Sequence, residues 1–118
     1  MHVHGFKFDL AVLGTPEEGA PEPDRVIAGA PRTKTWNLEE TPDGKIFAGV
    51  WECTPGTWRI SYDEWESCTL ISGISVVTED GRAPVTLEAG DTMILRPGFA
   101  GTWQVIETTR KFYVIRLS

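Results

Sequence analysis

Short apolar runs, each closed by a turn signal, constrain the fold of this chain more than any other feature. From about Lys34 onward, the runs KIFAGVWEC, TWRISY and ISVVT end at TPG, DEWE and EDG. No segment carries a convincing series of apolar residues at the i, i+3, i+4 spacing of an amphipathic helix. Strands at near-regular spacing without helices between them predict an all-β antiparallel sandwich or barrel.

The first third of the chain differs from the rest. Residues 14–32 hold four prolines, which disfavour both helices and central strands. We expect these residues to form an extended arm on the surface or on a partner subunit, and residues 6–13 to form a short strand before it. The predicted organisation is an N-terminal strand and proline-rich arm over residues 1–33, followed by a barrel over residues 34–118.

The charge and length of the chain exclude several classes of partner. The 118 residues carry a formal net charge of -6, which argues against nucleic acid and against an anionic membrane surface, because both attract clustered Lys and Arg. No apolar run reaches the roughly 18–20 residues of a membrane helix. Lys7 and Asp9 interrupt the apolar stretch that a signal peptide needs, so we expect a cytoplasmic location. Cys53 and Cys68 are then expected as free thiols, with a disulfide as the alternative if their strands are neighbours.

Two turn motifs in the second half of the chain are more specific. EAGD before a strand and RPG after it form the middle signature of a jelly-roll barrel. Together with GVWECTPGTWRISYDEWESCTLISG and RKFYVI, they make residues 36–115 resemble the small single-domain cupins (RmlC-like jelly rolls) grouped with ureidoglycine aminohydrolase and with the ethanolamine-utilisation cupin. The resemblance implies a double-stranded β-helix barrel and a homodimer.

The cupin pattern also implies where metal ligands would lie. Counted back from Gly73, the glutamate of the pattern falls on Glu66 and its two first histidines on Ile60 and Tyr62, while the later histidine falls on Gly101. A divalent transition metal needs three or four well-placed N, O or S donors. Only Glu66 retains a usual ligand type, so we expect no tightly bound metal and no other cofactor.

Two features leave a divalent metal open as the alternative. Strand alternation puts Cys68 on the same face as Glu66, and the HVH spacing puts His2 and His4 on one face of a segment able to fold back or swap into the barrel. Such a site would favour a metal-dependent hydrolase of the aminohydrolase type. Exposed terminal histidines are the simpler expectation.

Alternation along the strands predicts a polar, aromatic-lined pocket. Glu66 is the candidate catalytic residue, since a carboxylate among rings is suited to act as a general acid or base. The resemblance favours an inward direction for the Lys and Tyr of RKFY. Such a pocket suits a small polar ligand, and its rings and carboxylate suit an ammonium group. The residues expected to bind it are Trp58, Tyr62, Cys68, Trp103, Lys111 and Tyr113.

We therefore interpret the chain as a protein with a metal-poor, aromatic-lined pocket that holds a small polar metabolite, which is an amine, an amino acid or a carboxylate. If it is an enzyme, a hydrolase or an isomerase is expected. Two other interpretations stay open. Glu66 could be a structural carboxylate that pairs with Lys111, and the whole chain could be a structural or regulatory dimer whose barrel is filled by its own side chains.

Overall fold

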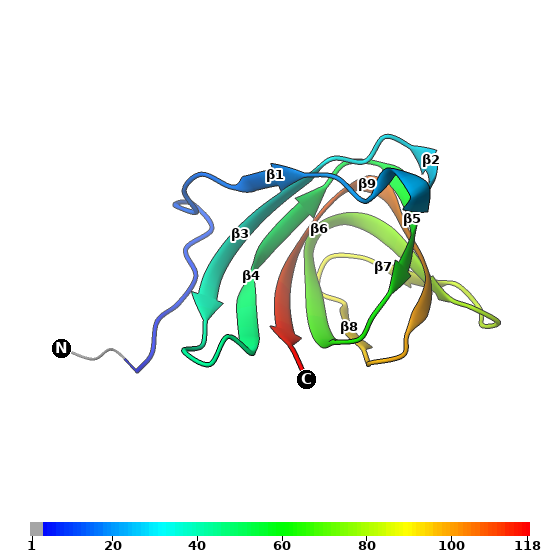
Figure 1. Ribbon diagram of the computed structural model, residues 1–118. Coiled ribbons are helices and arrows are strands. Elements are labelled where there is room, and N and C mark those ends of the chain that lie inside the picture. The colour runs from blue at the N-terminus through cyan, green and yellow to red at the C-terminus, as the bar shows by residue number, and fades with distance from the viewer. Residues whose placement is uncertain (1–3) are drawn as a thin grey trace.

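The computed structural model describes residues 4–118, which form one curled antiparallel β-sheet (Figure 1). A single turn of 3-10 helix, η1 (Pro23–Arg25), lies between the first two strands. The predicted all-β barrel is confirmed. The strands are β1 (Glu17–Gly19), β2 (Val26–Gly29), β3 (Thr33–Glu40), β4 (Ile46–Cys53), β5 (Gly56–Ser61), β6 (Trp65–Glu79), β7 (Val85–Leu87), β8 (Thr92–Leu95) and β9 (Ala100–Arg116).

Two long strands hold the barrel together. The strands pair in the order β1-β3-β4-β9-β5-β2, and β6 pairs separately with β7, β8 and β9. The last strand, β9, therefore contacts β5 with its first half, β4 with its second half, and β6 along its length. This arrangement curls the sheet on itself (Figure 1). The core and the cavity lie on the inner surface of the curl.

The prediction that the chain turns at Gly73 is wrong. Strand β6 runs through this residue, and its register against β9 shifts between Leu70 and Ser75. Gly73 has a φ of 88°, and a Cβ at this position would clash with the carbonyl oxygen of Thr108. The glycine therefore permits a bulge that bends β6 against its partner strand, instead of a chain reversal.

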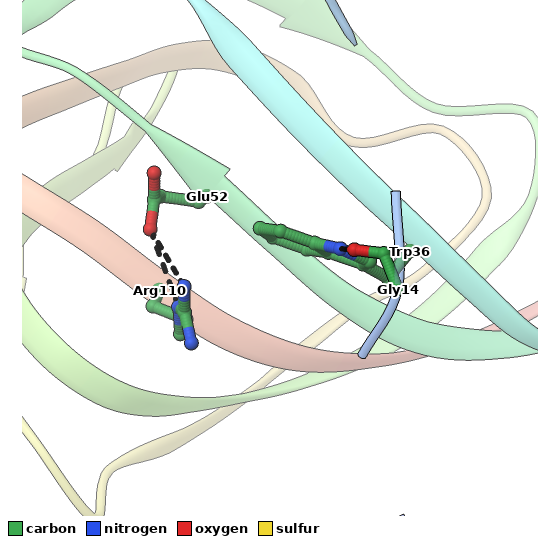
Figure 2. A network of polar contacts seen from close by, with 4 residues as sticks. All are labelled: Gly14, Trp36, Glu52 and Arg110. Carbon is green, nitrogen blue, oxygen red and sulfur yellow. Dashed lines mark hydrogen bonds and ion pairs between the residues drawn. The ribbon is translucent and has the colours of Figure 1, made fainter. Parts of the chain in front are cut away.

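The short strand predicted over residues 6–13 is also wrong. These residues form no strand and instead pack on the outer face of the sheet, where the ring of Phe8 lies 6.1 Å from that of Phe112. The indole N–H of Trp36 donates to the carbonyl oxygen of Gly14 at 2.9 Å (Figure 2). Side-chain contacts and this hydrogen bond hold the segment without strand pairing.

The proline-rich arm, residues 14–32, is extended as predicted and pairs with the sheet of its own chain. Its two short strands add to opposite ends of the strand order, β1 beside β3 and β2 beside β5. Residues 20–25, here called the strap, connect β1 to β2 and cross over one end of the barrel (Figure 1). The four prolines of the arm lie outside these two strands, where they remove no hydrogen bond of the sheet.

Apolar side chains fill the inside of the barrel beside the cavity, and three of them, Trp58, Ile60 and Trp103, also form part of the cavity wall. Cys53 and Cys68 are both buried, and both are free thiols, as predicted. No helix within residues 4–118 has the length and apolar character needed to cross a membrane. The buried core cluster comprises Cys53, Trp58, Ile60, Cys68, Leu70, Val77, Leu87, Leu95, Phe99, Trp103 and Val105.

Candidate functional site

A cavity of about 550 Å³ opens on the inner surface of the curled sheet. Its walls come from β1, β3, β4, β5, β6 and β9, together with the first residues of the strap. Alternation within each strand explains the lining, because residues two apart share a face. Six of the seven residues predicted from the sequence line it: Trp58, Tyr62, Glu66, Trp103, Lys111 and Tyr113.

A buried ion pair lies in the wall of the cavity. The ammonium of Lys111 donates to Glu66 Oε2 at 2.9 Å, and the two side chains are only 6% and 4% exposed. Burial opposes the charge on Lys111, but the carboxylate of Glu66 outweighs this effect, so the pKa of Lys111 is raised. The pairing that the sequence offered as an alternative is therefore present in the structure, and it lies in the cavity wall.

Two indole rings surround the same ammonium group. Lys111 Nζ lies 4.6 Å from the ring centre of Trp51 and 4.3 Å from that of Trp103, which are cation–π distances. The indole N–H of Trp103 donates to Ser75 Oγ at 3.1 Å, and that hydroxyl lies 2.7 Å from Thr109 Oγ1. This buried hydroxyl pair fixes the orientation of Trp103 against the lysine.

Both tyrosines of the chain lie in the cavity wall. Burial and then the charge of Glu66 raise the pKa of Tyr62 far above its ordinary value. Burial, followed by the charges of Glu66 and Glu17, raises the pKa of Tyr113 to about 12. The Tyr113 hydroxyl donates to Asn37 Oδ1 at 2.8 Å. Both phenols are therefore neutral hydrogen-bonding groups at neutral pH.

The prediction that Cys68 lines the pocket is wrong. Cys68 has the inward phase of Glu66, but it is fully buried in the core and does not line the cavity. Its thiol contacts the carbonyl oxygen of Met93 at 3.7 Å. Burial raises the pKa of Cys68, and it raises that of Cys53 to about 12, although Lys111 opposes both shifts. Neither thiol has the lowered pKa of a nucleophilic cysteine.

Several cavity residues were not identified from the sequence. Trp51 shares the cavity face of β4 with Phe47, as alternation along KIFAGVWEC would have indicated. Polar residues of β3 and residues of the arm carry no comparable local signal, because their approach to the cavity depends on distant pairings. The lining residues missed in this way are Glu17, Ala20, Pro21, Thr33, Thr35, Asn37, Phe47 and Trp51.

The side chains of the barrel do not fit the metal ion that the cupin pattern implies. Ile60 and Tyr62 lie in the cavity wall at the positions of the first two histidines. At Gly101, even a Cβ would clash with the carbonyl oxygen of Thr78, so no ligand side chain fits there. Over residues 4–118, no group of three or more His, Cys, Asp or Glu side chains is arranged to hold a metal ion.

Of the two N-terminal histidines of the alternative metal site, the structure describes only His4. His4 is exposed and does not line the cavity. His2 lies outside the described residues. The described residues place two carboxylates in the cavity wall, Glu66 and Glu17, but no group of three or more side chains that could hold a transition metal.

Comparison with known proteins agrees with this fold. The family of EutQ-like cupin domains matches residues 40–113, which is more than half of the chain. This chain belongs to the EutQ-like cupin domain family. The jelly-roll fold predicted from the sequence is thereby confirmed. The aminohydrolase part of the predicted resemblance stays a prediction, and no curated protein matches the chain.

Solved structures extend the comparison. The chain is similar to a DUF861-family protein of unknown function from Pseudomonas syringae pv. tomato, with 28% identity and a TM-score of 0.78. The match covers 86% of this chain but 43% of the other, so this chain spans less than half of that relative.

Two proteins of ethanolamine-utilisation type share the fold at lower identity. EutQ from Clostridium difficile is 22% identical with a TM-score of 0.65, over 84% of this chain and 80% of that one. A protein described as ethanolamine utilization protein Q from Salmonella typhimurium is 20% identical with a TM-score of 0.63, over 71% and 68% of the two chains. At these identities the likeness concerns the fold alone.

Proposed function

We propose that the EutQ-like cupin cavity of this chain binds a small polar metabolite without the help of a metal ion. The observation that carries this proposal is the buried pair of Glu66 and Lys111 beneath two indole faces, in the wall of a cavity of about 550 Å³. Cavities of roughly 300–1,000 Å³ with apolar walls and a few polar groups are typical of small-molecule sites.

Glu66 acts here as a binding group. Glu66 already accepts from the buried ammonium of Lys111 at 2.9 Å, and removal of one partner of such a buried pair costs roughly 3–5 kcal/mol. The carboxylate is therefore engaged by the lysine, and the remaining acceptor and donor positions of the pair contact the ligand. The sequence-based role of Glu66 as a general acid or base is therefore the less favoured one.

The cavity supports ligands with an amine, an amino acid or a carboxylate group, because its wall carries both signs of charge beside the two tyrosine hydroxyls. The names of the relatives suggest ethanolamine as one probe, since it joins an ammonium to a hydroxyl. A filled, purely structural barrel is less well supported, because the cavity leaves room beside the core cluster.

A thermal-shift screen in the presence of EDTA tests the proposal. The probes are ethanolamine, propylamine, glycine, glycolate and succinate. A probe at about one hundred times its dissociation constant should add roughly 2.7 kcal/mol of stability. We expect at least one probe to stabilise the wild-type chain under these conditions. No stabilisation by any probe, or stabilisation that requires an added divalent metal, would contradict metal-independent binding.

Two variants test whether probe binding depends on the Glu66–Lys111 ion pair. The double variant E66Q/K111M removes both charges together, which avoids leaving one of them buried alone. We expect it to lose the stabilisation by the active probe. The matched control is E88Q, which removes an exposed carboxylate outside the cavity lining and should respond like the wild type. Equal responses of the double variant and the wild type would place the ligand elsewhere.

The homodimer implied by the resemblance remains a prediction about the assembly. Size-exclusion chromatography with light scattering measures the mass of the particle directly, against 13.1 kDa for one chain. Twice that mass would support the dimer, and the mass of one chain would contradict it.

A further inference from the structure

The arm brings a second carboxylate to the cavity. Glu17 in β1 is the register partner of Thr35 in β3, and both residues line the cavity. The next residue, Glu18, pairs with Lys34 in the strand register and does not line the cavity. Alternation therefore separates two adjacent carboxylates, one that faces the cavity and one that does not.

We propose that Glu17 is the specificity-determining residue for a cationic group on the ligand, and that the bound ligand fastens the arm to the barrel. This inference rests on the proposed function and adds to it the charge of the ligand and a consequence for the arm. The expected ligand class is a small amine or amino alcohol, held by its ammonium near Glu17 and by its other end at the Glu66–Lys111 pair.

The charges of the cavity wall support a cation. Lys111 already compensates Glu66 at 2.9 Å, whereas no ion pair within residues 4–118 involves Glu17. The lining therefore carries one uncompensated negative charge, and it lies on the arm. An ammonium at this position gains a Coulomb attraction to the carboxylate, which is stronger where water is partly excluded.

The hydroxyl of Tyr113 marks where that cation would lie. Its pKa is raised by burial and by the negative charges of both Glu66 and Glu17, so both carboxylates act on this one phenol. The hydroxyl donates to Asn37 Oδ1 at 2.8 Å, which leaves its oxygen lone pairs free to accept a hydrogen bond from an ammonium group. The tyrosine ring adds an aromatic surface for the same cation.

The arm is held by few contacts at this end. Strand β1 has three residues, and its pairing with β3 extends over only three positions. The strap then crosses the barrel end (Figure 1). Its residues Ala20 and Pro21 lie in the cavity wall. Short edge pairings of this kind open with a low free energy. A ligand that contacts Glu17 and the barrel together would make this opening less frequent.

Paired probes test the charge selectivity. Isothermal titration compares ethanolamine with ethylene glycol, and propylamine with propanol, in the wild type and in E17Q and E18Q. We expect the wild type and E18Q to prefer each amine over its uncharged counterpart, and E17Q to bind the amine about fivefold more weakly. An unchanged amine affinity in E17Q, or a wild type that binds only glycolate or succinate, would overturn the inference while leaving the proposed function intact.

Limited proteolysis tests the fastening of the arm. Arg25, at the end of the strap, is exposed, and intact mass spectrometry identifies trypsin cleavage after it. We expect the preferred amine to slow this cleavage severalfold in the wild type and in E18Q, but not in E17Q. Cleavage that is equally fast with and without amine in the wild type would refute the fastening. If no probe at all binds the wild type, the proposed function itself fails.

Discussion

Two consecutive residues of β9 build similar contacts on opposite faces of the sheet. Arg110 points outward, donates to Glu52 at 3.0 Å and lies 5.1 Å from the ring centre of Trp36 (Figure 2). Lys111 points inward, where it pairs with a glutamate at 2.9 Å and lies beneath two tryptophans. Each face therefore combines a basic group, a carboxylate and an indole.

Burial separates the two arrangements. The side chains of Arg110 and Glu52 are 30% and 22% exposed, so water and salt screen their attraction, and such pairs contribute about 0–1 kcal/mol. The inner pair is almost wholly withdrawn from water, where the cost of desolvation is large and each charge depends on the other. The outer group therefore fastens the N-terminal segment, while the inner group is a costly polar site beside a cavity.

Removal of the inner lysine should have the largest effect. In K111M, Glu66 remains buried without its partner, and we expect the free energy of unfolding to fall by roughly 3–5 kcal/mol. The double variant E66Q/K111M should recover much of this loss because no isolated charge remains. Urea denaturation measures both. A loss below about 1 kcal/mol in K111M would show that the inner pair resembles the outer one.

Trp103 offers a smaller perturbation of the inner face. The variant W103F removes the indole N–H that donates to Ser75 and leaves a gap beside the lysine. We expect a loss of about 1–3 kcal/mol in urea denaturation. The variant W36F makes the same change on the outer face, where the indole donates to Gly14, and should cost only about 1 kcal/mol. Equal costs at both positions would contradict the difference between the faces.

The tyrosines report on the inner face alone, because the chain has two and both line the cavity. An unfolded tyrosine ionises near pH 10, whereas the pKa of Tyr113 is raised to about 12 in the folded chain. The folded state thus retains protons that the unfolded state loses. This contribution to stability is fully present below about pH 10 and is lost as the pH rises toward 12.

Ultraviolet absorbance during an alkaline titration measures this behaviour. We expect little tyrosinate absorbance at pH 10, and a rise that occurs near pH 12 or together with unfolding. Raising the pH also removes the proton of Lys111, whose raised pKa works in the same direction. Free ionisation of both phenols near pH 10 in the folded chain would mean that the cavity is open to water.

The outer pair should give the smallest effect. We expect R110M to lower the free energy of unfolding by at most about 1 kcal/mol, and the loss to shrink further in molar salt. Urea denaturation at low and high salt is the measurement. A loss as large as that of K111M, or one that salt does not change, would remove the distinction between the faces.

The sequence was most informative where strand alternation could be read from a single run. The phase of TWRISY placed Trp58 and Tyr62 in the cavity wall correctly, because side chains two apart share a face. For Lys111 and Tyr113, which also line the cavity, the inward direction came from the family resemblance and not from the phase. The phase of a residue in its strand does not tell, however, whether its side chain reaches the cavity or the filled core. Cys68 has the same phase as Glu66 but lies about 6.6 Å farther along the strand, in the filled core.

Features that depend on pairing between strands far apart in the chain could not be predicted from the sequence. Burial alone would place Trp36 inside, yet it lies on the outer face because the N-terminal segment covers it there. Gly73 looks like a turn, but its partner strand β9 continues and makes it a bulge. Glu17 enters the cavity only because β1 adds to the edge of β3, and no local pattern in the arm specifies that edge.

A crystal structure of the chain with its most strongly binding probe is the decisive test of metal-independent binding in the inner cavity. We expect the probe to lie in this cavity, within hydrogen-bond distance of the Glu66–Lys111 pair or of Tyr113, with no protein-bound metal ion beside it. A metal ion held there by three or more protein donors, or a probe seated elsewhere on the molecule, would refute metal-independent binding at this site.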